Sequence, residues 1–476
     1  MTVININNIS GIASVNAQSD SLELFTNGGA SLLDINANLA TFPADISVGG
    51  GAIVGGALTV TGVLTYDDVT NIDSVGVITA RSGVHVTSGS VGIGTDNPTG
   101  TNALTDNTST LAVGIATVGA LHVNGNAYPS AGALSNRNLV VNGAMRISQR
   151  ETSLASQTSG GYKCLDRFRM GQVNLGTWTY TQSTDAPAGF SRSFKCECTT
   201  ADASPAAGDL FNIQHRMEGQ ELQRLKKGTS SAESFTVSFW VKSNKTGTYN
   251  LQTEDLDNNR SNVRQYSIES ADTWEYKTLT FDGDTTGALD DNTDQSFRLI
   301  WWLGSGTNYS SGTTPSTWEA ATATNHAVGN VNLADSTSNV FYITGVQMET
   351  GSVATPFEHL TYNDDLARCQ RYYIRFVNDT TSMGINAPGY YNTGQYTYHI
   401  IYFPTAMRDN ISLQYSNLSD FDLEPWDYAM TSVTIYRSTP NYVTLQGEPA
   451  TTRSQGDVAS LTLDVTDSWI AFDAEL

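Results

Sequence analysis

Two groups of aromatic residues near the end of the chain have the types and spacing suited to sugar recognition. An aromatic ring can stack on the apolar face of a sugar while amide and carboxyl groups fix the hydroxyls, so aromatic residues in polar loops are the candidates. The predicted glycan-binding residues lie within APGYYNTGQYTYH and EPWDY and are Tyr390, Tyr391, Tyr396, Tyr398, Trp426 and Tyr428. The alternative, that these rings pack in a core or against another copy of the chain, remains open.

No set of residues in the sequence assembles a catalytic site. The chain lacks a G-x-S-x-G nucleophile motif, and its six histidines are scattered along it, at positions 85, 122, 215, 326, 359 and 399. A glycosidase needs two carboxyl groups that face each other across a cleft, and 47 acidic residues supply sequence pairs by chance. We therefore expect a protein that is not an enzyme, with a polysaccharide depolymerase as the less favoured alternative.

Metal binding is not predicted. Asp255 and Asp257 begin a segment similar to a calcium-binding loop, but Arg260 stands where that loop needs glycine and Tyr266 where it needs glutamate. A looser acidic group that could hold calcium weakly consists of Asp290, Asp291 and Asp294. We expect neither a metal ion nor a cofactor.

The composition indicates a β-rich chain with acidic surfaces. Charged residues make up 15% of the sequence, and Thr, Ser, Asn and Gly favour strands and turns over helices. A formal net charge of −22 argues against nucleic acid as a partner, because phosphate neutralisation requires lysine and arginine. An uncharged window near membrane length, residues 46–66, contains six glycines and several threonines, so no membrane insertion is expected.

Residues 1–136 differ from the rest of the chain. They contain no Trp or Lys and only four aromatic residues, and small aliphatic residues alternate there with Thr, Ser and Asn. A chain so poor in large side chains cannot build a thick core alone, which predicts narrow β structure shared between copies. A weak repeat relates residues 76–89 to residues 114–125. We expect a β-rich attachment or shaft region, with a flexible arm as the alternative.

The sequence from 137 to 360 predicts an antiparallel two-sheet sandwich. Runs with period-two alternation lie between polar turns, at residues 234–243, 273–283, 296–304 and 339–349. The alternation places Phe235, Val237 and Phe239 toward the core. Three tryptophans on these strands are expected to serve packing, namely Trp240, Trp301 and Trp302.

A short linking helix and a second β unit follow. Residues 361–376 read as an amphipathic helix that Asn363 could cap, with Asp364 and Asp365 at its positive N-terminal end. Residues 377–476 contain five strand-like runs, enough for a small β-sandwich head domain. The predicted fold class is thus all-β, an elongated multi-domain fibre with an N-terminal shaft, a central jelly roll, a linking helix and a C-terminal sandwich.

The middle region also resembles a known module. The run GVQMETGSVATPFEHLTYNDDLARCQRYY is similar to the end of a jelly-roll module found in many bacteriophage tail-fibre and tail-associated proteins. Residues 138–150 (NLVVNGAMRISQR) and 162–168 (YKCLDRF) resemble the opening of that module. The N-terminal runs DVTNIDSVGVITARSGVHV and GSVGIGTDNP resemble shaft regions of cyanophage structural proteins, and YFPTAMR and SNLSDF resemble the C-terminal heads.

This resemblance implies a role in the virion. It implies a homotrimeric tail fibre whose residues 1–136 attach to other tail or baseplate proteins and whose C-terminal domains contact a host surface glycan. The jelly roll is similar to the carbohydrate-binding modules of glycoside hydrolases. A fibre or decoration of the head, neck or baseplate with a purely structural role is the alternative. The expected location is the virion, after assembly in the host cytoplasm, since the N-terminus has no secretory signal pattern.

Overall fold

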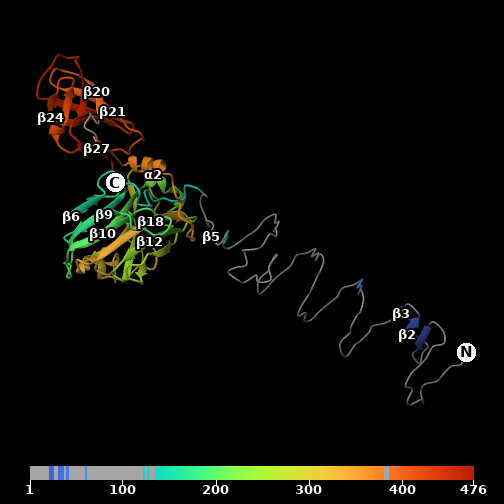
Figure 1. Cartoon of the computed structure of the whole chain (residues 1–476). Helices are drawn as coiled ribbons and strands as arrows, with labels where there is room; N and C mark the ends of the chain where they lie inside the picture. Colours follow the sequence, from blue (N-terminus) through green and yellow to red (C-terminus); the bar gives the residue numbers. More distant parts are fainter. Residues whose placement is uncertain are drawn as a thin grey trace. The chain divides into compact units, whose positions relative to one another are not determined.

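The computed structural model describes residues 135–379 and 385–476 in full, the backbone of five short strands before them, and Thr59 and Thr61. The chain divides into two units, residues 1–99 and 100–476. Figure 1 labels strands of both units. In the first unit, β1 (Ser21–Phe25), β2 (Ser31–Asn36) and β3 (Leu39–Thr41) form an antiparallel sheet. In the second, β4 (His122–Val123) pairs with β5 (Asn126–Ala127). The remainder of the predicted shaft and its repeat lies outside the described residues.

Residues 153–350 form a sandwich of two antiparallel sheets, as the strand pattern predicts. The first sheet has six strands, in the spatial order β15 (Glu275–Phe281), β12 (Phe235–Ser243), β18 (Val340–Thr350), β10 (Ser193–Thr200), β9 (Thr177–Ser183) and β6 (Ser153–Gln157). The second has seven, in the order β17 (Glu319–Ala320), β14 (Arg260–Ile268), β13 (Gly247–Asp255), β16 (Gln295–Ser305), β11 (Leu210–Glu218), β8 (Phe168–Val173) and β7 (Gly161–Tyr162).

The sandwich core lies between the inner faces of the two sheets. Phe235, Val237 and Phe239 of β12 are buried in it, which confirms the predicted alternation. At its centre the rings of Trp178 and Phe211, one from each sheet, stack with centroids 3.8 Å apart. Such aromatic pairs bury large areas and account for much of a core's stability.

The three tryptophans expected to pack do so in different ways. Trp301 is fully buried in the core, and Trp302 is buried on the opposite face of β16. The indole of Trp302 donates a 2.8 Å hydrogen bond to Gln252, and the short helix α1 (Thr307–Ser310) contributes Tyr309 to its cover. Trp240 is half-buried beside Tyr276, with ring centroids 5.3 Å apart.

The run that carries the family resemblance forms a hydrogen-bonded elbow after β18. The carboxylate of Glu349, 1% exposed, accepts hydrogen bonds from the amide and the hydroxyl of Thr355, at 2.9 and 2.7 Å. Gln347 accepts a bond from the amide of Glu358, whose own carboxylate accepts the amide of Asn138 at 2.9 Å. The opening and closing segments of the sandwich are thereby joined through buried polar groups.

The helix after the elbow is shorter than predicted, and its cap differs. Helix α2 (Tyr362–Gln370) begins after Thr361, whose hydroxyl accepts a hydrogen bond from the amide of Asp364. Thr361 rather than Asn363 is therefore the N-cap, while Asp364 and Asp365 lie in the first turn as expected. The helix ends at Gln370, and strand β19 (Tyr373–Val377) begins three residues later, within the range predicted as helical.

The C-terminal β unit contains a closed six-stranded barrel, not the predicted small sandwich. The barrel order is β20 (Asn386–Tyr391), β21 (Thr397–Tyr402), β25 (Tyr442–Pro449), β24 (Tyr428–Thr439), β23 (Phe421–Glu424) and β26 (Val458–Leu463). It closes because β26 pairs with β20 on one edge and with β23 on the other. A separate sheet is formed by β19, β27 (Trp469–Asp473) and β22 (Ser412–Tyr415).

Residues after β27 place carboxylates beside arginines of the sandwich. Glu475 forms an ion pair with Arg167, whose side chain is 1% exposed, and lies 3.3 Å from Arg150. The guanidinium of Arg167 also lies over the ring of Tyr372, 3.4 Å from its centroid. These contacts make one buried charge network.

The described residues contain no disulfide bond and no membrane-spanning helix. All four cysteines are free and buried, at positions 164, 196, 198 and 369. In the described part of the chain no helix has the length and apolar character needed to span a bilayer.

Acid is expected to weaken the barrel through His399. This side chain is fully buried on β21, with Nδ1 2.9 Å from the carbonyl of Ala387, and burial lowers its pKa from the ordinary 6.5 to about 4. The folded chain therefore binds fewer protons than the unfolded chain in that window, so stability present above pH 6.5 is lost as the pH falls. We expect a loss of about 2 kcal/mol between about pH 7 and about pH 5.

The measurement is urea unfolding of wild type and His399→Gln across that pH range. The variant should lose this share of the acid sensitivity, whereas His359→Gln, at an exposed histidine, should keep most of it. Equal pH slopes for wild type and His399→Gln would contradict the assignment.

Candidate functional site

The outer face of the barrel positions the exposed aromatic residues. On β21, Thr397, His399 and Ile401 are buried in the barrel, so the intervening residues face outward. Those outward residues include Ile400 and Tyr402, which are 41% and 72% exposed. Period-two alternation thus converts a sequence rich in tyrosine into one buried face and one aromatic outer face.

Strand register brings three of the outward tyrosines together as an outer aromatic cluster, defined as Tyr390, Tyr398 and Tyr436. Tyr390 of β20 lies directly opposite Tyr398 of β21, with ring centroids 6.2 Å apart. Tyr398 and Tyr436 have centroids 4.7 Å apart, and Gln446 donates a 3.1 Å hydrogen bond to the Tyr398 hydroxyl. The three rings come from β20, β21 and β24, and β25, which supplies Gln446, lies between the last two strands of the barrel wall.

A hollow of about 360 Å³ lies at this cluster. Its lining consists of Pro388, Gly389, Tyr390, Asn392, Tyr398, Ile400, Tyr436, Arg437 and Thr444. A second hollow, of about 460 Å³, shares Pro388 and Ile400 with the first and extends to Tyr402. The first hollow combines aromatic faces, an amide, a hydroxyl and one cation, the groups that hold a polar ring compound with apolar faces.

The second predicted aromatic group lies at another place on the barrel and is less accessible. The rings of Trp426 and Tyr428 are half-buried and lie 6.2 Å apart, centroid to centroid. Arg453 donates a 2.7 Å hydrogen bond to the hydroxyl of Tyr428, and its guanidinium lies 4.5 Å from the ring centroid of Trp426. This group is already satisfied by its own contacts, which favours a structural role.

The six predicted residues therefore separate. Tyr390 and Tyr398 join the outer aromatic cluster. Tyr391 instead is fully buried, and its ring centroid lies 6.3 Å from that of Trp426. Tyr396 is half-buried in the turn between β20 and β21, where its carbonyl accepts the amide of Asn392. The buried face of Tyr391 is not available to a ligand.

Sequence reasoning missed Tyr436, Arg437 and Gln446. Their strands were predicted, but β24 contains a bulge between Ile435 and Arg437, so that Tyr436 and Arg437 are both exposed. A bulge breaks the strict alternation of inward and outward side chains, and no residue type in the run SVTIYRS predicts where the bulge lies. Only the pairing with β25 shows which residues share the outer face.

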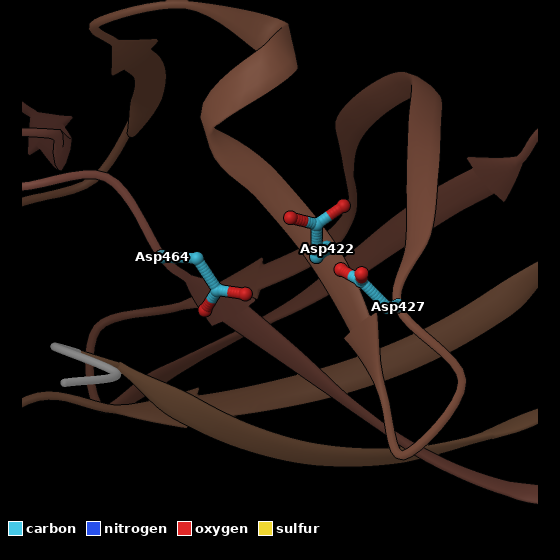
Figure 2. A group of neighbouring side chains, drawn as sticks. All are labelled: Asp422, Asp427 and Asp464. Atoms are coloured by element: carbon cyan, nitrogen blue, oxygen red, sulfur yellow. The ribbon is translucent and has the colours of Figure 1, made fainter.

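One acidic cluster was also missed. Asp422 on β23, Asp427 in the turn after β23 and Asp464 directly after β26 approach so closely that one carboxylate oxygen from each lies within 4.8 Å of the others (Figure 2). Burial, and then the neighbouring carboxylates of Asp427, Asp464 and Glu424, raise the pKa of Asp422. Carboxylate oxygens at this spacing are chemically suited to Ca²⁺.

The close acidic cluster does not include either segment that the sequence suggested for calcium. Asp255 is buried and pairs with Lys227 at 2.5 Å, as part of the turn that Asn258 closes. Among the described residues, the loop predicted as a weak alternative forms no group of three close ligands; it comprises Asp290, Asp291 and Asp294.

Comparisons with known proteins found only distant structural similarity. No protein-family model and no curated protein matches the chain. Solved structures similar to it include the enzymatically active domain of tailspike protein 4 from bacteriophage CBA120, at 15% identity and a TM-score of 0.24 over 45% of this chain and 21% of that one. The match therefore spans about a fifth of the length of that tailspike chain.

Two further similar structures are covered almost completely. A putative sugar binding protein from Bacteroides thetaiotaomicron is 10% identical, with a TM-score of 0.26 over 45% of this chain and 100% of that one. The family 11 carbohydrate-binding module of a Clostridium thermocellum cellulase is 9% identical, with a TM-score of 0.23 over 42% of this chain and 97% of that one.

Proposed function

We propose that this protein is a non-enzymatic phage tail fibre that contacts a host surface glycan through its C-terminal barrel. The observation that carries the proposal is the outer aromatic cluster beside a hollow of about 360 Å³. The resemblance of residues 138–376 to a tail-fibre jelly-roll module supports the virion role. The buried polar elbow explains what that shared run does in the fold.

The chemistry of the hollow favours a sugar over an apolar ligand. Tyrosine rings supply the flat apolar faces on which a sugar ring stacks, and the hydroxyl of Tyr398 is already oriented by Gln446. Asn392 and Thr444 add hydrogen-bonding groups at the rim. A purely apolar ligand would leave these groups without partners, which costs binding free energy.

The proposed assembly is a homotrimer attached to tail or baseplate proteins through residues 1–136. Each single site would be weak, because a shallow surface hollow buries only part of a sugar chain. Three copies per fibre, and several fibres per particle, would raise the overall avidity without any new contact. A structural decoration of the head, neck or baseplate differs in that it needs no glycan site.

The first test is binding of the full-length chain to an array of bacterial surface polysaccharides. Tyr398→Ala should reduce the bound signal about tenfold or more, because it removes the central ring of the cluster from every copy. Tyr276→Ala is the matched control, since Tyr276 is a 44% exposed tyrosine on the sandwich strand β15 and should leave binding unchanged.

The other outcomes decide between the alternatives. Absence of binding to every polysaccharide would favour the structural decoration, and release of reducing ends would favour the depolymerase. The native mass from light scattering should lie near three times 51.2 kDa. A monomeric mass would remove the trimer from the proposal.

A further inference from the structure

The charge of the barrel unit makes one arginine unusual. Residues 385–476 contain eleven carboxylate side chains, no lysine and three arginines. Arg408 is buried and donates to the carbonyls of Thr293, Ala474 and Glu475. Arg453 is held by Tyr428 and Trp426. Arg437 is the third, and it is exposed at the hollow.

Arg437 has no charged partner among residues 135–379 and 385–476. Its guanidinium lies beside the ring of Tyr436, 5.1 Å from the centroid, and none of the ion pairs found there involves it. The hollow that it lines contains no carboxylate. Within the part of the chain that the structure describes, a protein with a net charge of −22 thus presents an unpaired cation inside its aromatic hollow.

We propose that the hollow selects an anionic sugar residue, with its carboxylate on Arg437 and its ring on the outer aromatic cluster. This inference rests on the proposed glycan-binding function and names the class of sugar. A guanidinium binds a carboxylate through two parallel N–H donors, and such charge-assisted bonds are about twice as strong as neutral ones. Asn392 and Thr444, which also line the hollow, would hydrogen-bond the hydroxyls of the same sugar ring.

The surrounding acidity gives Arg437 a selective role. An anionic polysaccharide is repelled by an acidic surface over roughly a Debye length, about 8 Å at physiological salt. A local cation reverses this repulsion at one place and fixes which ring of the polymer enters the hollow. Without Arg437 the same tyrosines would favour neutral sugars, since repulsion would then act on acidic ones alone.

The test uses the full-length chain on an array of uronic-acid-containing bacterial polysaccharides, each printed beside its own carboxyl-reduced form. The two members of a pair share rings and linkages and differ only in carboxylate against hydroxymethyl. Wild type should bind the acidic member about tenfold more tightly, and this preference should fall as salt is raised. Arg437→Gln should abolish the preference, and Arg437→Lys should keep part of it.

A matched variant and two further readouts keep the outcome clear. Arg224→Gln, at an exposed arginine of the sandwich, should retain the preference. Equal binding of both members by wild type, still lost in Tyr398→Ala, would overturn the acidic selection and leave glycan binding intact. Absence of binding to any member would overturn the proposed function itself. A lower native mass of Arg437→Gln would overturn both assignments of the hollow, because it would identify this face as a contact between copies.

Discussion

Replacement of Glu475 by leucine is expected to lower the free energy of unfolding by about 3 to 5 kcal/mol. The side chains of Arg167 and Glu475 are only 1% and 4% exposed, so the substitution leaves a buried guanidinium without its carboxylate. Arg150 would lose one of its three carboxylate neighbours at the same time, keeping Asp166 and Asp473. Breaking one side of a buried pair is costly because the desolvated charge remains.

Urea unfolding followed by tryptophan fluorescence measures this effect, since six of the eight tryptophans lie in the sandwich. Glu475→Gln should have a smaller effect, because its amide oxygen still accepts from Arg167. The control is Glu197→Gln, in which the pair with Lys195 is 41% exposed on the glutamate side, and it should cost less than about 1 kcal/mol. Similar values for Glu475→Leu and Glu197→Gln would show that the buried network contributes little.

Replacement of Glu349 by leucine is expected to cost about 3 kcal/mol or more and to loosen the elbow. The substitution removes the acceptor of two hydrogen bonds from Thr355 and of one from Gln347, all of them buried. Each buried donor left without a partner costs about 1 to 3 kcal/mol. Hydrogen exchange at residues 351–360, measured by mass spectrometry, should become faster as the segment opens.

Thr355→Val separates the contribution of the Thr355 hydroxyl from that of the Thr355 amide. Valine keeps the amide that bonds to Glu349 and removes only the hydroxyl, so we expect about 1 kcal/mol and slow exchange at the elbow. If Glu349→Leu were as mild as Thr355→Val, the elbow would be held by its apolar contacts instead of its polar ones.

The existence and inner faces of the strands could be predicted from alternation alone. Phe235, Val237 and Phe239 lie in the core as expected, because a half-buried strand repeats its environment every two residues. The pairing of the strands could not be predicted in the same way. β26 pairs on both of its edges, and nothing within a single strand indicates that the sheet closes into a barrel.

The candidate site shows the same limit at the scale of single residues. Tyr390 and Tyr391 are neighbours of identical type, yet one is 50% exposed and the other is fully buried, because adjacent residues of β20 face opposite sides of the barrel wall and residue type does not tell which of the two faces inward. Asp422 and Asp464 meet although 42 positions separate them in the sequence, because β23 and β26 are paired. Spacing within one segment carries no information about such an encounter.

Barrel closure also bears on how copies of the chain behave when crowded together. A sheet edge exposes a row of unpaired amides and carbonyls on which another chain can add a strand, and such addition leads to aggregation. The sandwich sheets end in edge strands such as β15 and β17, but each of the six barrel strands has a hydrogen-bonded neighbour on both sides. The barrel can therefore expose an aromatic face at high local concentration without an open sheet edge to which a strand of another copy could add.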